Sequence, residues 1–400
     1  MRVAAAFVFV VLSWFAGATA VQGAGLVEMA PWLTRFTGGL KGVYTPVEGR
    51  ALAWSLTWSG DDGAVRSGEI KVAGPDMMLR VALKFHAADN RLVWRVTEGR
   101  VDLAAWLPAL AARPELAALD GTTVTGALEI TGEGDLIGSV PTGTLSIDWR
   151  EGTARNDTQG WSLAGVTLHA GGEVAALAKG NVPLELKVGT ISTARFGARA
   201  LRMSAMLIDF TRADVAAAEV EIAGGKVITQ PFGVELKEPR LAVDISMIKV
   251  GLQDIAALVP DFLADGRGRV NGAVRLNWSQ RDGVSVGLGH ISIDPEERAE
   301  VRFRPNPGLL TGSLPPAILK YYPGLTNVEM GQASLLAERF DVRFSPEGDA
   351  EGRTATVNIA GGPVDTSLKA PLVLTINVRG PLAPLLKFGS TPGLGLSGAK

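Results

Sequence analysis

The side chains that most often carry out catalysis or bind metals are scarce in this chain. Its 400 residues include no Cys and three His, which are His86, His169 and His290. Without Cys there is no disulfide, no thiolate nucleophile and no thiolate ligand for zinc or an iron–sulfur cluster. His290 stands where Thr144 stands in a similar segment of the same chain, so we do not expect it to be a ligand. The sequence therefore predicts no metal and no cofactor.

One serine stands in a pattern known from hydrolases. Ser285 is the centre of a Gly-x-Ser-x-Gly sequence, which activates a serine where a strand turns sharply into a helix. Here the alternating residues continue to Ile293 and no helical pattern follows, so the segment fits a strand. The paired acids at 61–62 and 296–297 lie among turn residues and fit solvated loops. We therefore expect a protein that is not an enzyme.

The overall composition indicates a folded chain with a sizeable core. Hydrophobic residues make up 46% and charged residues 20% of the sequence. Lys and Arg number 39 against 41 Asp and Glu, which gives a net charge of −2. There is no basic surplus to neutralise phosphates, so we expect no nucleic-acid partner. The 49 Gly residues favour many tight turns between short strands.

Apolar and polar residues alternate with a period of two along most of the chain, as in half-buried strands. In the run 77–85 the odd positions are apolar, whereas Arg80 and Lys84 lie between them. The same pattern recurs in the runs 52–58, 128–130, 145–149, 161–168, 184–188, 241–247, 270–278, 291–293, 301–303, 342–344, 357–359 and 372–378.

These patterns predict a mainly β fold. We expect an elongated, twisted antiparallel sheet of about fifteen to eighteen strands, forming a repeating groove with a few short amphipathic helices. Helical spacing of apolar residues is seen at 103–119 and 253–263, and the segments 314–322 and 328–339 are two further candidates. Strands and helices do not alternate regularly, which argues against a doubly wound enzyme fold.

Two stretches of the chain match each other at a fixed offset. Val124-x-Gly126-Ala127-Leu128 corresponds to Val270-x-Gly272-Ala273-Val274, and the run 143–148 corresponds to 289–294, which also ends in Ser-Ile-Asp. Both pairs are about 146 positions apart, which indicates an internal duplication. We therefore divide the chain into an N-terminal β segment at 21–90, a first repeat unit at 91–240 and a second at 241–400.

The first twenty residues read as a targeting segment. Met1-Arg2 precedes an uncharged apolar run at 3–20 that ends in Ala18-Thr19-Ala20. This small-x-small ending is typical of a signal-peptidase site, so we expect a secretory signal peptide at 1–20. The run is also long enough to remain uncleaved as a single membrane anchor. Both interpretations place the rest of the chain outside the cytoplasm.

A sheet with one apolar face must cover that face. The face either closes against a second layer as a dry core, or part of it remains open for lipid. Leaving an acyl chain in water costs about 0.8 kcal/mol per methylene, so a lipid carrier needs an apolar trough. Candidate residues for such a groove are Leu52, Trp54, Leu56, Trp58, Met77, Leu79, Val81, Leu83, Phe85, Leu241, Val243, Ile245, Leu372, Leu374 and Ile376.

The C-terminal part carries a resemblance to a known family. Five segments contribute to it: Gly268-Arg269-Val270-Asn271-Gly272, the run 283–293, the Pro-bounded stretch 301–305, the helix-like segment 328–337 and the strand 371–382 that ends in Gly-Pro-Leu. Over about residues 240 to 388 the chain resembles the YdbH family of AsmA-like envelope proteins, which is also catalogued as a dicarboxylate-transport domain family. The family's better-known members are longer, and nothing before about residue 90 matches them.

The resemblance implies a periplasmic β-groove, linked to the inner membrane, that carries phospholipid toward the outer membrane. Phospholipid acyl chains would be its ligand, and an outer-membrane protein or lipoprotein its partner. Two alternatives stay open: a dry-core β scaffold or partner-binding envelope protein, and a component of dicarboxylate transport. The last would need convergent Arg or Lys side chains in a pocket. Arg80, Arg302 and Arg304 instead fall on the polar faces of their strands.

Overall fold

A computed structural model gives the architecture of the chain. It describes residues 33–47, 50–60, 65–111, 119–137, 140–193, 197–209, 211–235, 240–253, 263–279, 283–294, 296–308, 311–312, 314–321, 324–363 and 372–378. The expected signal peptide at 1–20 and most of the helix expected at 253–263 lie outside these residues.

The chain divides into two compact units. Unit 1 comprises Met1–Thr190 and Arg202–Val215, and unit 2 comprises Ile191–Leu201 and Ala216–Lys400. The division passes through three strands, β10 (Val182–Thr193), β11 (Gly197–Ile208) and β12 (Arg212–Ile222), so each of them gives residues to both units.

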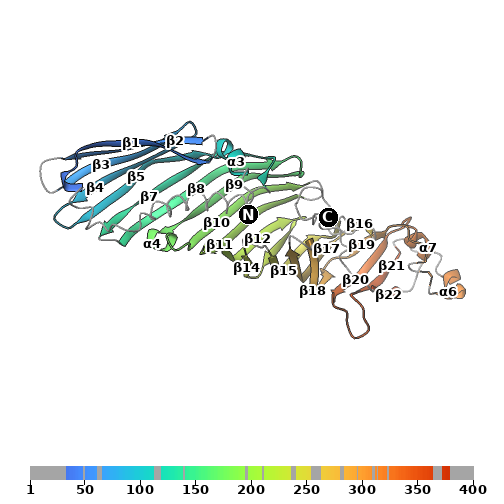
Figure 1. Ribbon diagram of the computed structural model, residues 1–400. Coiled ribbons are helices and arrows are strands. Elements are labelled where there is room, and N and C mark those ends of the chain that lie inside the picture. The colour runs from blue at the N-terminus through green and yellow to red at the C-terminus, as the bar shows by residue number, and fades with distance from the viewer. Residues whose placement is uncertain are drawn as a thin grey trace. The chain divides into compact units, whose positions relative to one another are not determined.

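Unit 1 is a run of antiparallel strands in which nearly every strand pairs with the next one along the chain (Figure 1). β5 skips to β7, the short β6 lies on β8, and β9 pairs with β10. Two helices interrupt the strands, α3 (Leu103–Ala111) and α4 (Val174–Leu177). The strands are β1 (Gly38–Val47), β2 (Arg50–Gly60), β3 (Val65–Gly74), β4 (Met77–His86), β5 (Arg91–Asp102), β6 (Thr122–Thr125), β7 (Ala127–Ile137), β8 (Val140–Asn156) and β9 (Trp161–Glu173).

Unit 2 repeats this design with more crossovers. Its main ladder runs through β13, β15, β17, β18, β20, β21 and β22, each antiparallel to the next, whereas β16 and β19 form a side pair joined to β20. Its helices are α6 (Pro316–Tyr321) and α7 (Gly324–Glu329). The strands are β13 (Gly225–Thr229), β14 (Phe232–Glu235), β15 (Arg240–Gly251), β16 (Leu263–Arg267), β17 (Arg269–Ser279), β18 (Gly283–Ile293), β19 (Ala299–Phe303), β20 (Leu335–Phe344), β21 (Ala355–Pro363) and β22 (Leu372–Val378).

The predicted fold class is confirmed: the protein is mainly antiparallel β with a few short helices. Each run of alternating residues named above falls within a strand. The described residues form 22 strands, more than expected, in part because β1 and β12 carry little apolar contrast. Ser285 lies inside β18, so the nucleophile-elbow geometry is absent there.

One helix prediction is wrong. The segment 328–339 does not form a helix, because α7 ends at Glu329 and β20 starts at Leu335. Gly331 ends the helix with a φ of 67° and donates its N–H to the Val328 carbonyl at 3.0 Å. The helix expected at 314–322 is confirmed as α6, and the one expected at 103–119 begins at Leu103 and is described as far as Ala111.

Both units contain the same arrangement of two paired strands joined, just beyond their last pair, by a backbone hydrogen bond to a glycine carbonyl. We call this arrangement strand–latch–strand and the glycine the latch glycine. In unit 1, Val101 pairs with Leu128, and the Leu103 N–H donates to the Gly126 carbonyl at 3.3 Å. In unit 2, Val250 pairs with Val270, and the Leu252 N–H donates to the Gly268 carbonyl at 3.0 Å. The two latch glycines have positive φ values of 98° and 107°.

The structural correspondence corrects the repeat alignment. The geometry matches Val270 to Leu128, whereas the sequence match paired Val270 with Val124, four residues away. The shared Ser-Ile-Asp does not mark equivalent places either. Asp148 lies inside β8, opposite Glu129, whereas Asp294 follows the end of β18.

Candidate functional site

A row of apolar side chains crosses the first five strands of unit 1. Strand register places Leu40 beside Leu56, Leu56 beside Ile70, Ile70 beside Val81, and Val81 beside Val96. Directly paired residues of an antiparallel sheet point to the same face. Leu40 is 45% exposed and the other four side chains are half-buried. We call these five residues open row 1; four strand spacings of about 4.8 Å make it about 19 Å long.

Toward one end of the strands, beside open row 1, the segment 33–37 covers the apolar face. Leu33 is buried with Trp58, Leu83 and Phe85 in one apolar cluster. The Trp58 Nε1–H donates to the Leu33 carbonyl at 2.8 Å. Arg66 fixes the same segment, because its guanidinium donates to the Phe36 carbonyl at 2.9 Å. This end of the apolar face is therefore a dry, packed core.

Helix α3 lies at the opposite end of the strands (Figure 1). It contacts β5, β6 and β7, and its side chains Leu103, Trp106 and Leu107 are buried. Arg50 at the start of β2 donates to the Ala105 carbonyl of α3 and forms an ion pair with Asp76 at 2.5 Å. Open row 1 thus crosses the sheet between two covered ends.

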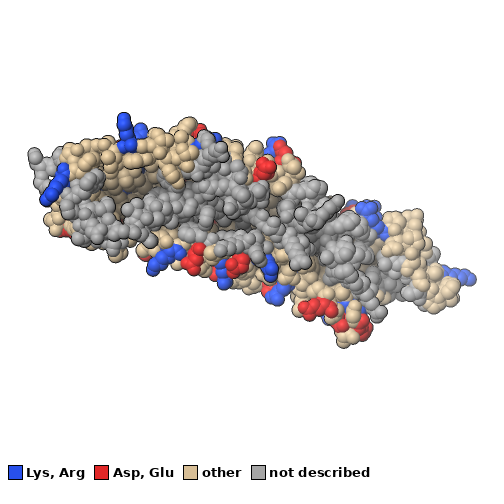
Figure 2. Space-filling view, viewed as in Figure 1, with Lys and Arg blue, Asp and Glu red and all other residues tan. Residues whose placement is uncertain are grey.

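Tryptophan rings on the apolar face lie flat over glycines of neighbouring strands. A Cβ on Gly42 would come within 2.7 Å of the Trp54 ring, and a Cβ on Gly68 within 2.1 Å of the Trp58 ring. Trp149 covers Gly152 in the same manner. The missing side chains let the rings lie close to the sheet; Trp58 and Trp149 are buried there, whereas Trp54 is 37% exposed. In the view of Figure 2 the surface over β1 and β2, at the upper left, is mostly tan, with a few Lys and Arg side chains projecting from it.

Unit 2 has an apolar row of its own. Val227, Met247, Ile291, Val342 and Val357 follow one another across β13, β15, β18, β20 and β21, with Gly272 of β17 between Met247 and Ile291. All five side chains are half-buried, and they pack against a buried cluster that includes Val250, Val270 and Ile293. We call these five residues open row 2.

The predicted groove residues fall into separate groups. Half-buried members are Leu56, Met77, Val81, Leu241 and Ile245, and Trp54 is 37% exposed. Fully buried members, which belong to packed core and not to an open surface, are Leu52, Trp58, Leu79, Leu83, Phe85 and Val243. Leu372, Leu374 and Ile376 pair with Gly361, Ile359 and Val357 along β22, and their side chains lie outside the described part.

Sequence reasoning missed several members of the two rows. Leu40, Ile70 and Val96 were not among the candidates, nor was any residue of open row 2. A signal existed for Ile70, because Ile70 and Val72 alternate with Glu69 and Lys71 in β3. Leu40 carries no such signal, since Gly38 and Gly42 occupy the positions two residues before and after it, where an alternating strand would carry apolar side chains.

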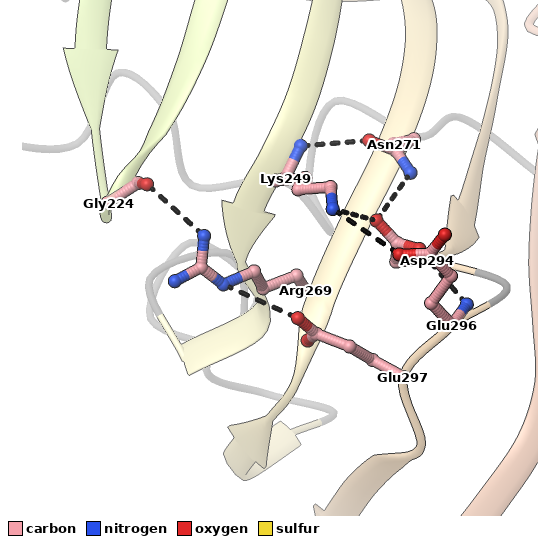
Figure 3. A network of polar contacts seen from close by, with 7 residues as sticks. All are labelled: Gly224, Lys249, Arg269, Asn271, Asp294, Glu296 and Glu297. Carbon is pink, nitrogen blue, oxygen red and sulfur yellow. Dashed lines mark hydrogen bonds and ion pairs between the residues drawn. The ribbon is translucent and has the colours of Figure 1, made fainter.

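A polar network closes the end of β15, β17 and β18 in unit 2 (Figure 3). Asp294 is 3% exposed, accepts the Glu296 backbone N–H at 3.1 Å and lies 3.5 Å from the Lys249 ammonium. Asn271 joins them: its amide oxygen accepts the Lys249 backbone N–H at 2.8 Å, and its Nδ2 lies 3.4 Å from Asp294. The Glu296 N–H, followed by Asn271 and Lys249, lowers the pKa of Asp294 against the opposing effect of burial.

The lowered pKa of Asp294 predicts an acid-sensitive contribution to the stability of unit 2. A carboxylate with a depressed folded-state pKa stabilises the fold above its unfolded pKa of about 3.9, and this contribution is lost as pH falls through the folded value. Thermal unfolding should therefore show a deficit for Asp294→Asn that is full at neutral pH and disappears in strong acid. Glu347→Gln, at an exposed position, is the control. A deficit of equal size at every pH would contradict the assignment.

Many of the other charged side chains among the described residues form ion pairs at the surface. Arg80 pairs with Glu98 at 3.1 Å and Arg302 with Asp265 at 3.9 Å, so neither points into a shared anion pocket. In the described part of the chain no group of three His, Asp or Glu side chains could hold a metal ion. No helix among those residues is both long and apolar enough to cross a membrane.

The comparisons with known proteins add no assignment to this geometry. Models of known protein families give no match to the chain, and a search of curated protein sequences gives none either.

Proposed function

We propose that this protein is a non-enzymatic lipid-binding protein of the bacterial envelope, which holds phospholipid acyl chains along its open rows. In this role it moves phospholipid through the periplasm between the inner and outer membranes. The observation that carries the proposal is open row 1, an apolar strip between two covered ends. Its length of about 19 Å is comparable to one leaflet of a bilayer whose hydrocarbon core is about 30 Å thick.

Burial of hydrocarbon supplies the driving force. Each acyl methylene that leaves water for the row gains about 0.8 kcal/mol. The row offers Leu56, Ile70 and Val81 side chains, none of which has a hydrogen-bonding group to leave unsatisfied. Two expectations from the sequence also support a role in the envelope: the export expected from the run 3–20 and the resemblance to AsmA-like envelope proteins.

Neighbouring residues of one strand provide the test. Val81 and Ala82 are consecutive in β4 and therefore point to opposite faces of the sheet. A photo-reactive residue at 81 should crosslink to phospholipid in cells, whereas the same residue at 82 should not. Native mass spectrometry of the purified protein should show bound phospholipid. Absence of both bound lipid and crosslink at 81 would leave a dry-core envelope scaffold as the remaining interpretation.

A further inference from the structure

The edge formed by β1 and β2 carries a cluster of exposed apolar side chains. Val43 is 70% exposed, Tyr44 50%, Leu40 45% and Trp54 37%. Leu40, Tyr44 and Trp54 share one face, because Trp54 pairs with Gly42, which lies between the other two. Val43 lies on the opposite face, so β1 is apolar on both sides. Contiguous exposed apolar side chains of this kind mark interaction surfaces.

The charges around this edge are mainly positive and therefore favour binding to an anionic partner. From residue 33 to residue 60 the sequence holds three basic residues, Arg35, Lys41 and Arg50, against the single acid Glu48. Arg50 is paired with Asp76, whereas Arg35 and Lys41 are exposed. A second exposed apolar pair, Ile137 and Val140, lies where β7 meets β8, but β7 itself carries Glu129, Glu133 and Asp135.

We infer that the β1–β2 edge is a docking surface for the headgroup layer of an anionic lipid bilayer. Tyr and Trp side chains favour that layer, since one part of each is apolar and another forms hydrogen bonds. Among the strands described, β1 pairs with β2 alone. A backbone group that lacks a partner is costly in hydrocarbon, so we place the contact in the hydrated headgroup layer and not in the bilayer core.

The position of the edge in the chain agrees with this surface. Twelve residues, 21–32, lie between the end of the apolar run 3–20 and Leu33. If that run is retained as an anchor, the intervening chain spans at most about 40 Å, so β1 stays close to the bilayer. Docking goes beyond the proposed acyl-chain binding, because a surface contact does not require any lipid to leave the membrane.

The absence of Cys allows a site-specific test on the full chain. Val43→Cys and Val140→Cys, 70% and 59% exposed, are each labelled with the same environment-sensitive dye. The probes are phosphatidylcholine vesicles with and without phosphatidylglycerol, carrying a nitroxide quencher near the headgroup or deep in the acyl region. If the run 3–20 is retained as an anchor, it attaches both labelled proteins to the vesicles equally. A difference in quenching between positions 43 and 140 therefore reports on the β1–β2 edge.

The docking surface predicts that the dye at 43 is quenched on anionic vesicles, more by the shallow quencher than by the deep one, and that the dye at 140 is not. Arg35→Gln combined with Lys41→Gln should weaken binding to anionic vesicles about 25-fold, because each basic side chain near the surface contributes about fivefold to the affinity. Equal quenching at both sites, or none at 43, would overturn the inference. So would a dye response at 43 that grows with protein concentration without vesicles, which would identify a second copy as the occupant.

Discussion

Ile70→Asp combined with Val81→Asp is expected to remove bound phospholipid from the protein while leaving it folded. Both side chains are half-buried members of open row 1, so water can reach the new carboxylates, and both also pack against the cluster of Leu33, Trp58, Leu83 and Phe85, so the fold of the variant has to be checked first. An acyl chain lying along the row would have to pass two charges. Keeping about three methylenes in water costs about 2.4 kcal/mol, which lowers affinity about 60-fold. Native mass spectrometry and displacement of a fluorescent fatty acid measure the loss.

Ala82→Asp is the matched control for this experiment. It introduces the same charge one residue away in β4, on the polar face opposite Glu69 and Arg95. Circular dichroism should give the same spectrum for the wild type and both variants. Unchanged lipid content in the double variant would show that the acyl chain lies elsewhere, and loss of lipid in Ala82→Asp as well would point to a general effect of charge.

Phe85→Ala is expected to destabilise unit 1 by about 3–5 kcal/mol, the usual cost of emptying a fully buried phenyl site. Phe85 is 0% exposed and packs in one cluster with Leu33, Trp58 and Leu83. The loss has two parts, the transfer energy of the ring and the cavity that it leaves. Urea denaturation followed by tryptophan fluorescence reports the change, because Trp58 and Trp94 lie in or against the same cluster.

Val140→Ala serves as the comparison for Phe85→Ala. Val140 is 59% exposed, and exposed substitutions usually change stability by less than about 0.5 kcal/mol. A midpoint for Phe85→Ala as high as that of Val140→Ala would mean that the 33–37 segment does not close the face in solution. In that case Trp58 and Leu83 would also be accessible, and the open apolar surface would extend to them.

The class of fold could be predicted from the sequence because alternation is a local property. Met77, Leu79, Val81, Leu83 and Phe85 identify both β4 and its apolar side without any tertiary information. Strand β12 was harder to predict, because Ala216, Ala217 and Ala218 at its centre give no difference in polarity between the two faces. The helix predicted at 328–339 is wrong because the turn at Gly331, with a φ of 67°, interrupts the apolar spacing after α7 ends.

The candidate site could be predicted only in part. Val81 and Phe85 share a strand and a face, yet Val81 is half-buried and Phe85 has no exposed surface. What separates them is coverage by the segment 33–37, which is about fifty residues away in the chain. Alternation tells which face a side chain joins, whereas its exposure depends on contacts that are distant in sequence. The edge patch at Leu40 and Tyr44 was missed for the related reason that exposed apolar residues look like core residues in a sequence.

The four residues that separate the structural counterpart of Val270 (Leu128) from its counterpart in the sequence match (Val124) have an evolutionary consequence. A strand returns to the same orientation every second residue, so even-numbered insertions lengthen it without inverting its sides. An insertion or deletion of an odd number of residues would instead move every apolar side chain of the shifted strand to the opposite face of the sheet. If the two units arose by the duplication that the sequence match predicts, shifts by two or four residues would let their sequences diverge while each unit keeps the same apolar side.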